Sequence, residues 1–127
     1  MWWRVAGVMG ALAVAMGAFG AHAVRDAVSE QALGWWRTGA QYHMVHALAL
    51  GLVAAHPSRP KGAGIAFVIG IVVFCGSLYT MTLTDLRIFG AITPIGGLAF
   101  ITGWLWLGLS SVQSSPVAVV EHSEESP

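Results

Sequence analysis

The sequence predicts an all-α protein, a bundle of four transmembrane helices. Three observations predict it: the composition, the spacing of the apolar stretches and the positions of the tryptophans. Of the 127 residues only 9% are charged, against about 25% in ordinary soluble domains, and 56% are hydrophobic. A chain this short cannot bury so much apolar surface in a core of its own. We therefore expect a lipid bilayer to be its solvent.

Four apolar stretches are each close to the roughly 20 residues that cross a hydrocarbon core of about 30 Å. The loops between the last three are short, because residues 56–62 hold two prolines, which stop helices, and residues 85–87 form a tight turn. We expect residues 1–109 to form one transmembrane domain and residues 110–127, rich in Ser and Glu, to be a disordered polar tail. The predicted spans are about residues 5–23, 38–55, 63–84 and 88–109.

The segment between the first two spans, residues 24–37, is mildly amphipathic, which predicts a helix lying along the membrane interface. A second interpretation stays open. Ser29 is a suitable N-cap with Glu30 in the first turn after it. One long helix would then continue through Trp35 and Trp36 into the membrane.

The first span has an alternative interpretation of its own. Arg4, the apolar run and the sequence AHA at residues 21–23 are similar to a secretory signal peptide with its cleavage site. The run is long for that role, and its glycines are typical of a packed helix. We therefore interpret it as a membrane span.

The tryptophans support four spans because all six fall at two levels, the interfacial belts that indole rings prefer. With four spans both termini lie on the same side. Basic side chains set the orientation, and here they tie, so the free amino terminus favours cytoplasmic termini. Trp2, Trp3, Trp104 and Trp106 lie on the side of Arg4, Arg59 and Lys61, whereas Trp35 and Trp36 lie on the side of Arg25, Arg37 and Arg87.

Small residues are predicted to hold the helices together, because apolar surface gives helices no drive to associate in lipid and close packing must supply it. In the first span they recur at helical spacing and form one stripe. In the fourth, Pro94 cannot donate to the Gly90 carbonyl and should kink the helix, with the Thr93 hydroxyl as a substitute donor. The predicted packing residues are Gly10, Ala13, Gly17, Gly20, Pro94, Gly96 and Gly97.

Polar side chains within the spans gather, by residue counting, in the half of the bilayer below the loop that joins the first two spans. His46 lies about 12 Å and Tyr79 about 8 Å below that surface. His43 and His46 are about 60° apart around their helix, so both can face the bundle interior. The candidate polar site comprises His22, His43, His46, Ser77, Tyr79 and Thr93.

This layer has a structural interpretation and several functional ones. Hydrogen bonds between neutral histidine, Tyr79 and Ser77 would set helix register, at well under 2 kcal/mol each. A metal needs three or four ligands, and only His22 is placed to join His43 and His46. Haem between His22 and His46 has no supporting motif, and a proton or ion relay there lacks a buried carboxylate. We therefore predict no metal or other cofactor.

Four motifs, in order and spacing, resemble a known family. They are GAFGAHA (residues 17–23), YHMVHALAL (42–50), GSLY (76–79) and ITPIGGLAFITGW (92–104). The family is that of small bacterial inner-membrane proteins represented by YgdD, which has eukaryotic transmembrane relatives. The resemblance covers about residues 5–108 and implies a four-span protein of the bacterial plasma membrane, with no activity attached. It carries over onto His22, His46, Ser77, Tyr79, Thr93, Pro94, Gly96 and Gly97, whereas at His43 glutamine is expected as readily, which argues against a histidine-pair metal site.

Two classes of function remain. The first is a non-enzymatic membrane protein, an accessory subunit or a self-associating structural component, favoured by small size and by the lack of a catalytic constellation. The second is an intramembrane site for a small ligand, metal or haem, or for proton or ion handling. A formal net charge of zero gives no basic field for nucleic acid, and a single cysteine, Cys75, excludes an internal disulfide. Expected partners are the lipid bilayer and either a larger membrane complex or further copies of the chain.

Overall fold

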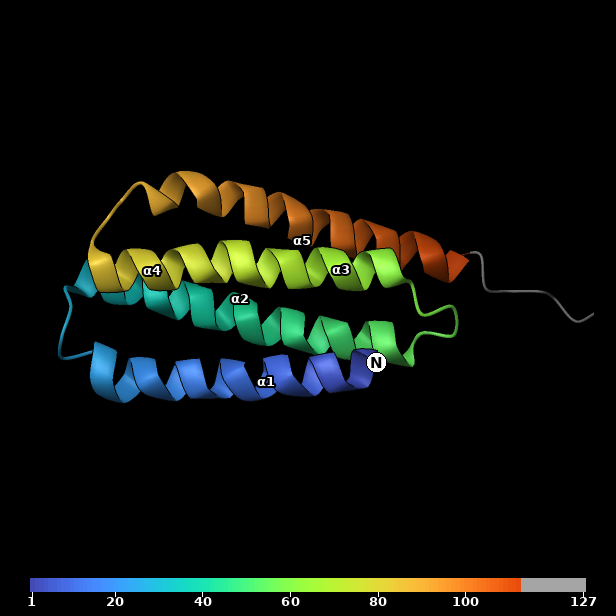
Figure 1. Ribbon diagram of the computed structural model, residues 1–127, viewed down its shortest axis with the longest axis horizontal. Coiled ribbons are helices and arrows are strands. Elements are labelled where there is room, and N and C mark those ends of the chain that lie inside the picture. The colour runs from blue at the N-terminus through green and yellow to red at the C-terminus, as the bar shows by residue number, and fades with distance from the viewer. Residues whose placement is uncertain (113–127) are drawn as a thin grey trace, which may run out of the picture.

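The computed structural model describes residues 1–112, which form helices and the loops between them (Figure 1). This confirms the all-α prediction for that part of the chain. The predicted tail, residues 110–127, lies outside the described residues except for its first three, which belong to the last helix. The elements are α1 (Trp2–Phe19), the π-helix η1 (Gly20–Val24), α2 (Glu30–Ala55), α3 (Lys61–Gly70), the π-helix η2 (Ile71–Cys75), α4 (Gly76–Thr84) and α5 (Phe89–Val112).

The elements join into four antiparallel rods. The continuous rod α3–η2–α4 and the helix α2 lie in the middle, α1 packs against α2, and α5 packs against the rod (Figure 1). In the described part of the chain, three rods are long and apolar enough to cross a membrane: Trp2–Val24, Lys61–Thr84 and Phe89–Ser110. The helix α2 is not among them, because polar residues such as Gln41, His43 and His46 lower the hydropathy of its apolar stretch. The fourth predicted span therefore depends on where α2 lies relative to the other three.

The segment between α1 and α2 adopts the second of its two predicted forms. The residues after η1 form a short loop, and the rest of the segment forms the first turns of α2. Ser29 is the N-cap, and its hydroxyl accepts a hydrogen bond from the Ala32 N–H at 3.2 Å, which satisfies one of the orphan donors at the helix start. The helix therefore begins at Glu30, well before the predicted start near residue 38.

Aromatic rings seated on glycines hold neighbouring rods together. At six glycines a Cβ atom would overlap an aromatic ring of another helix, so the absent side chain is what lets the ring lie against the backbone. At Gly96 the approach is closer still, because a Cβ there would meet the backbone of Phe74 in η2. The ring contacts are Gly20 with Trp36, Gly39 with Tyr79, Gly62 with Trp106, Gly64 with Trp2, Gly70 with Phe100 and Gly103 with Phe67.

Only part of the predicted small-residue stripe of the first span packs against another helix. Ala13 and Gly20 are buried, whereas a Cβ at Gly10 or Gly17 would meet nothing within 4 Å. The reason is that α2 is the main neighbour of α1, so α1 buries one narrow face. That face contains Trp2, Ala6, Met9, Ala13, Met16 and Gly20, and Gly10 and Gly17 lie beside it.

The other predicted packing residues lie in α5. Gly96 makes the backbone contact described above, while a Cβ at Gly97 would reach only the rim of the Phe74 ring, at 3.9 Å. The helix continues through Pro94 without a break. The Thr93 hydroxyl donates to the Phe89 carbonyl at 3.1 Å, one residue before the Gly90 carbonyl for which it was the expected substitute donor.

The contact at Gly96 gives a direct test of this packing. In Gly96→Ala the added methyl group must push α5 away from the backbone of η2, and we expect the free energy of unfolding to fall by about 1–3 kcal/mol. The matched control is Gly108→Ala in the same helix, where a Cβ meets nothing within 4 Å and the higher helix propensity of alanine should be neutral or stabilising. Unfolding followed by circular dichroism in detergent micelles measures both. Equal effects of the two substitutions would contradict the packing.

Candidate functional site

The structure does not bring the six candidate side chains into one layer. They separate into a histidine bonded to a tryptophan, a histidine bonded to a tyrosine, a pair of hydroxyl groups, and one histidine apart from the rest. Each pair joins two different rods, so each was placed by tertiary packing. The three pairs are His46 with Trp104, His43 with Tyr79, and Ser77 with Thr93.

His46 is held on both ring nitrogens. Its Nε2 lies 3.1 Å from the indole Nε1 of Trp104 in α5, and its Nδ1 lies 2.7 Å from the Tyr42 carbonyl oxygen one turn earlier in α2. The imidazole is buried and stacks face to face on Phe100, with ring centroids 3.4 Å apart and an interplanar angle of 11°. Phe67 covers it from a further side, at a centroid distance of 5.7 Å.

These partners determine which nitrogen of His46 carries the proton. An indole N–H only donates, so Nε2 of His46 must accept, and a carbonyl only accepts, so Nδ1 must donate. The ring is therefore neutral with its proton on Nδ1. Neither nitrogen has a lone pair left for a metal ion unless the bond to Trp104 breaks.

The depth of His46 differs from the predicted one because α2 begins earlier than predicted. The Thr82 hydroxyl of α4 donates to the Ala32 carbonyl at 3.0 Å, so the start of α2 is level with the end of α4. At 1.5 Å per residue, His46 lies about 21 Å further along α2 than Ala32. Tyr79 and Thr93 lie within two turns of that same end of the bundle, which leaves His46 in the other half.

His43 and Tyr79 form the second pair. The phenol oxygen of Tyr79 lies 3.3 Å from Nδ1 of His43, and both side chains are buried. The Tyr79 ring lies against Gly39 and packs on Trp36, with ring centroids 4.6 Å apart. The Nε2 atom of His43 is buried and has no hydrogen-bond partner within residues 1–112. An unpaired buried polar atom is costly, so this nitrogen is the least satisfied group of the candidate set.

Ser77 and Thr93 tie α4 to α5. Their hydroxyl oxygens lie 2.7 Å apart, and the Ser77 hydroxyl also lies 2.9 Å from the Phe74 carbonyl, which accepts from it. Together with the bond from Thr93 to Phe89, these contacts use the donors of both hydroxyl groups within the protein. The pair therefore serves helix packing.

His22 stands apart from the other candidates. It is exposed in η1, and its side chain forms no hydrogen bond with any other described residue. Within residues 1–112 no group of three or more His, Cys, Asp or Glu side chains is placed to hold a metal ion. His22 therefore does not join His43 and His46 as the third ligand that a metal site would need.

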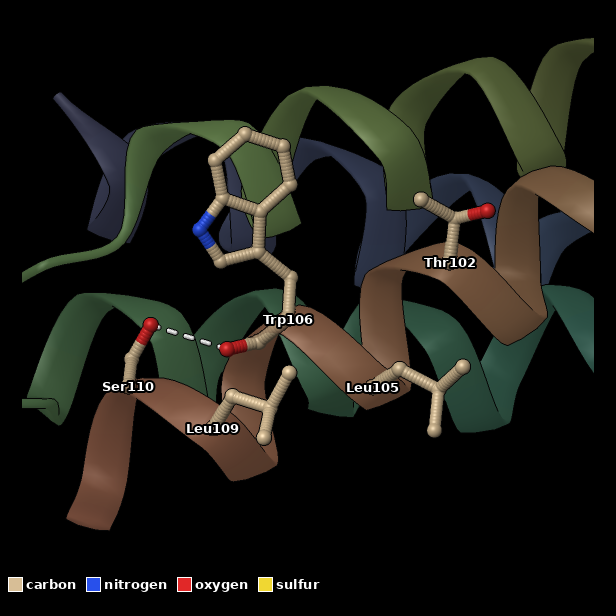
Figure 2. Close-up of a pocket in the computed structure, with 5 residues that line it drawn as sticks. All are labelled: Thr102, Leu105, Trp106, Leu109 and Ser110. Carbon is tan, nitrogen blue, oxygen red and sulfur yellow. Dashed lines mark hydrogen bonds between the residues drawn. The ribbon is translucent and has the colours of Figure 1, made fainter.

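Three pockets lie close to these side chains or to the end of α5. One of about 510 Å³ runs between α2 and α5 past Tyr42, His46 and Trp104. Another, of about 300 Å³, lies beside His43 and Tyr79 and is otherwise apolar. The third, about 380 Å³, lies on the surface of α5 (Figure 2). There the Trp106 ring reaches toward α3 and the Ser110 hydroxyl donates to the Trp106 carbonyl at 2.8 Å, and the lining side chains carry no ionisable group.

Sequence reasoning missed three aromatic residues that define these sites. Trp104 was expected to be an interfacial anchor, yet its indole donates to His46. Trp36, likewise expected at the interface, is 1% exposed and donates to the Met16 carbonyl of α1 at 2.8 Å. Phe100 stacks on His46. For Trp36 and Phe100 the available signal was the glycine that each ring covers, Gly20 and Gly70, but the sequence does not say which ring covers a given glycine.

The sequence of the chain matches the model of a known protein family. A family model described as "Protein of unknown function (DUF423)" matches residues 16–97, more than half of the chain. The chain belongs to the DUF423 family. The match includes α2, the rod α3–η2–α4 and the first third of α5, and with them all three hydrogen-bonded pairs except the Trp104 side of one.

Individual relatives of the chain agree with this family assignment. The chain is 44% identical over 108 residues to the UPF0382 membrane protein YwdK of Bacillus subtilis, covering 80% of this chain and 88% of that protein. It is 35% identical over 113 residues to the UPF0382 inner membrane protein YgdD of Escherichia coli, covering 85% and 86%. This confirms the predicted resemblance, and these names identify the relatives as membrane proteins. No solved structure matches the chain.

The bond between Trp104 and His46 is testable by substitution. Trp104→Phe keeps a ring but removes the donor and leaves Nε2 of His46 unpaired, and we expect it to lower the free energy of unfolding by about 1 kcal/mol. Trp3→Phe is the matched control, because Trp3 is 64% exposed and its indole nitrogen makes no hydrogen bond with any described residue. A double-mutant cycle with His46→Phe isolates the pair energy. A coupling energy of zero would show that the two side chains do not interact.

Proposed function

We propose that this chain is a four-span, non-enzymatic protein of the bacterial plasma membrane, acting as an accessory subunit of a larger complex or as a self-associating structural component. The observation that carries the proposal is the hydrogen bonding of the buried polar groups. His46, Ser77 and Thr93 each form a hydrogen bond with a carbonyl oxygen of their own rod and another with a polar side chain of a neighbouring rod. Groups that are satisfied in this way set helix register and leave little for substrate chemistry.

The course of the chain supports a fourth span in α2. The rod that starts at Trp2 ends at one end of the bundle, and α3 starts at the other end (Figure 1). If both rods cross the bilayer, the chain between them must cross back, and α2 is the element that does so. Its 26 residues give a length of about 39 Å, and its less apolar composition fits a central position, where α1 and the other rods cover it.

Cysteine accessibility tests this topology. In a Cys75→Ala background, single cysteines at Ala27, Ser58 and Leu86 report on the three loops. We expect a membrane-impermeant maleimide to label positions 27 and 86 from outside the cell and position 58 only after permeabilisation, because four spans with cytoplasmic termini place the loop between α2 and α3 inside. Labelling of positions 27 and 58 from the same side would show that α2 does not cross.

A second function has one specific observation in its favour, the unpaired Nε2 of His43. This atom belongs to a side chain that lines, with Tyr79, the pocket of about 300 Å³ whose other walls come from α1 and η2. A neutral imidazole next to a phenol can accept or pass on a proton, or hold a small ligand through one hydrogen bond. The candidate ligand or proton site is thus confined to His43 and Tyr79, without His22, His46 or Thr93.

Purification from native membranes separates the two functions. We expect native mass spectrometry of the full-length chain in mild detergent to give a multiple of its 13.4 kDa mass or a stoichiometric complex with a larger membrane protein, with no non-lipid small molecule retained. A monomeric chain that retains such a molecule would overturn this expectation. Loss of that molecule in His43→Ala and Tyr79→Phe, but not in the control His22→Ala, would establish the second function.

A further inference from the structure

A basic pocket lies between the end of α1 and the first turns of α2. It has a volume of about 260 Å³, and it is separate from the pockets beside His43 and His46. Its floor consists of the small residues Gly17, Gly20, Ala21 and Ala40. Two arginines line it, Arg25 directly after η1 and Arg37 as the eighth residue of α2.

The wall of this pocket is fixed by the fold. Trp36 stands in it with its ring against Gly20, and its indole nitrogen donates to the Met16 carbonyl at 2.8 Å. Phe19 also contacts that ring, at a centroid distance of 5.6 Å. Because these contacts already hold the neighbouring residue, a ligand at Arg37 meets a surface that is ordered before it binds.

The positive charge of the pocket is not neutralised by the protein. Arg37 forms no ion pair or hydrogen bond with any described residue. Arg25 approaches Asp26 at 3.7 Å, which is longer than a hydrogen bond, and both side chains are largely exposed, by 64% and 82%. An exposed pair of this kind contributes little. Two guanidinium groups that share one pocket without a buried carboxylate attract an anion.

The position of the pocket selects the kind of anion. The apolar rod Trp2–Val24 ends at the residue before Arg25, so the pocket opens where the hydrocarbon core gives way to the headgroup layer. Below it, the exposed Gly17 leaves an open strip along α1, since a Cβ there meets nothing within 4 Å. A ligand with a phosphate at the surface and an alkyl chain below it fits both features.

We propose that Arg25 and Arg37 bind the phosphate group of an anionic phospholipid, whose acyl chain lies over Gly17. Guanidinium groups bind phosphate oxygens through paired hydrogen bonds, and a net negative headgroup is favoured over a zwitterionic one because a second cation repels the choline or ethanolamine ammonium. The proposal depends on the membrane placement of the α1 rod and is independent of whether α2 spans the bilayer or of any accessory role.

Titration of the purified full-length protein with dioleoyl phosphatidylglycerol, followed by native mass spectrometry, tests the charged contacts. We expect Arg25→Gln and Arg37→Gln each to weaken lipid binding about fivefold, and the double substitution about twentyfold. Phosphatidylcholine should bind the wild type at least about fivefold more weakly. Arg87→Gln is the matched control, because Arg87 lies at the same end of the bundle but outside the pocket, bonded to Gln31 at 3.3 Å, and we expect it to bind as the wild type does.

A steric variant tests the pocket without changing its charge. Gly17→Leu fills the floor, and Gly7→Leu adds the same side chain to an equally open position of α1 outside the pocket. We expect only Gly17→Leu to lose phosphatidylglycerol, and circular dichroism should show both folded. Equal losses in Arg37→Gln and Arg87→Gln would reduce the effect to surface charge and overturn the site. Displacement of the lipid by inorganic phosphate at similar concentration would show that the ligand is a soluble anion, which would overturn the lipid assignment.

Discussion

The close approach of aromatic rings to glycine backbones is the interaction on which the rest of the structure depends. In hydrocarbon, apolar surface gives helices no reason to associate, so contact must come from dense packing. Here rings of one rod lie directly on glycines of the next, and the polar contacts follow from that spacing. Trp36 reaches the Met16 carbonyl because Gly20 leaves room for the nitrogen-bearing edge of its ring. Likewise Gly96 seats α5 on η2, which brings Phe100 and Trp104 to His46.

The same packing explains how α2 carries two buried histidines. Both nitrogens of the neutral His46 imidazole are hydrogen-bonded, and aromatic rings cover it. The side chain therefore links α2 to α5 through its hydrogen bond with Trp104. His43 has one bond, to Tyr79, and one idle nitrogen. Two residues that look alike in sequence therefore differ in chemistry, and the difference lies in what the neighbouring rods offer. The relatives of this DUF423 chain are membrane proteins, and the family description names no activity, so the chemistry of each histidine is inferred from its contacts.

The outer surface of the bundle is the other place where this protein can act. The α1 and α5 rods are mostly exposed, with 11% and 22% of their central segments buried, against 50% for the rod α3–η2–α4. Lipid, a partner protein or another copy must cover these faces. The basic pocket beside η1 adds a specific polar contact to an otherwise apolar surface. Within residues 1–112, the buried side-chain nitrogen and oxygen atoms are hydrogen-bonded except for Nε2 of His43 and the indole nitrogen of Trp2, whereas the two arginines of the basic pocket are exposed.

The sequence by itself determined the solvent, the helical class and the family, because composition and apolar run length depend only on local residue content. It also identified Ser29 as an N-cap, since capping is a local interaction. Only the tertiary structure decided which side chains meet. The rotation of each rod follows from which neighbours cover it, as the division between Ala13 and the open Gly10 and Gly17 shows. Its register follows from contacts such as Thr82 with Ala32, and these moved His46 from the expected phenol at Tyr79 to the indole of Trp104.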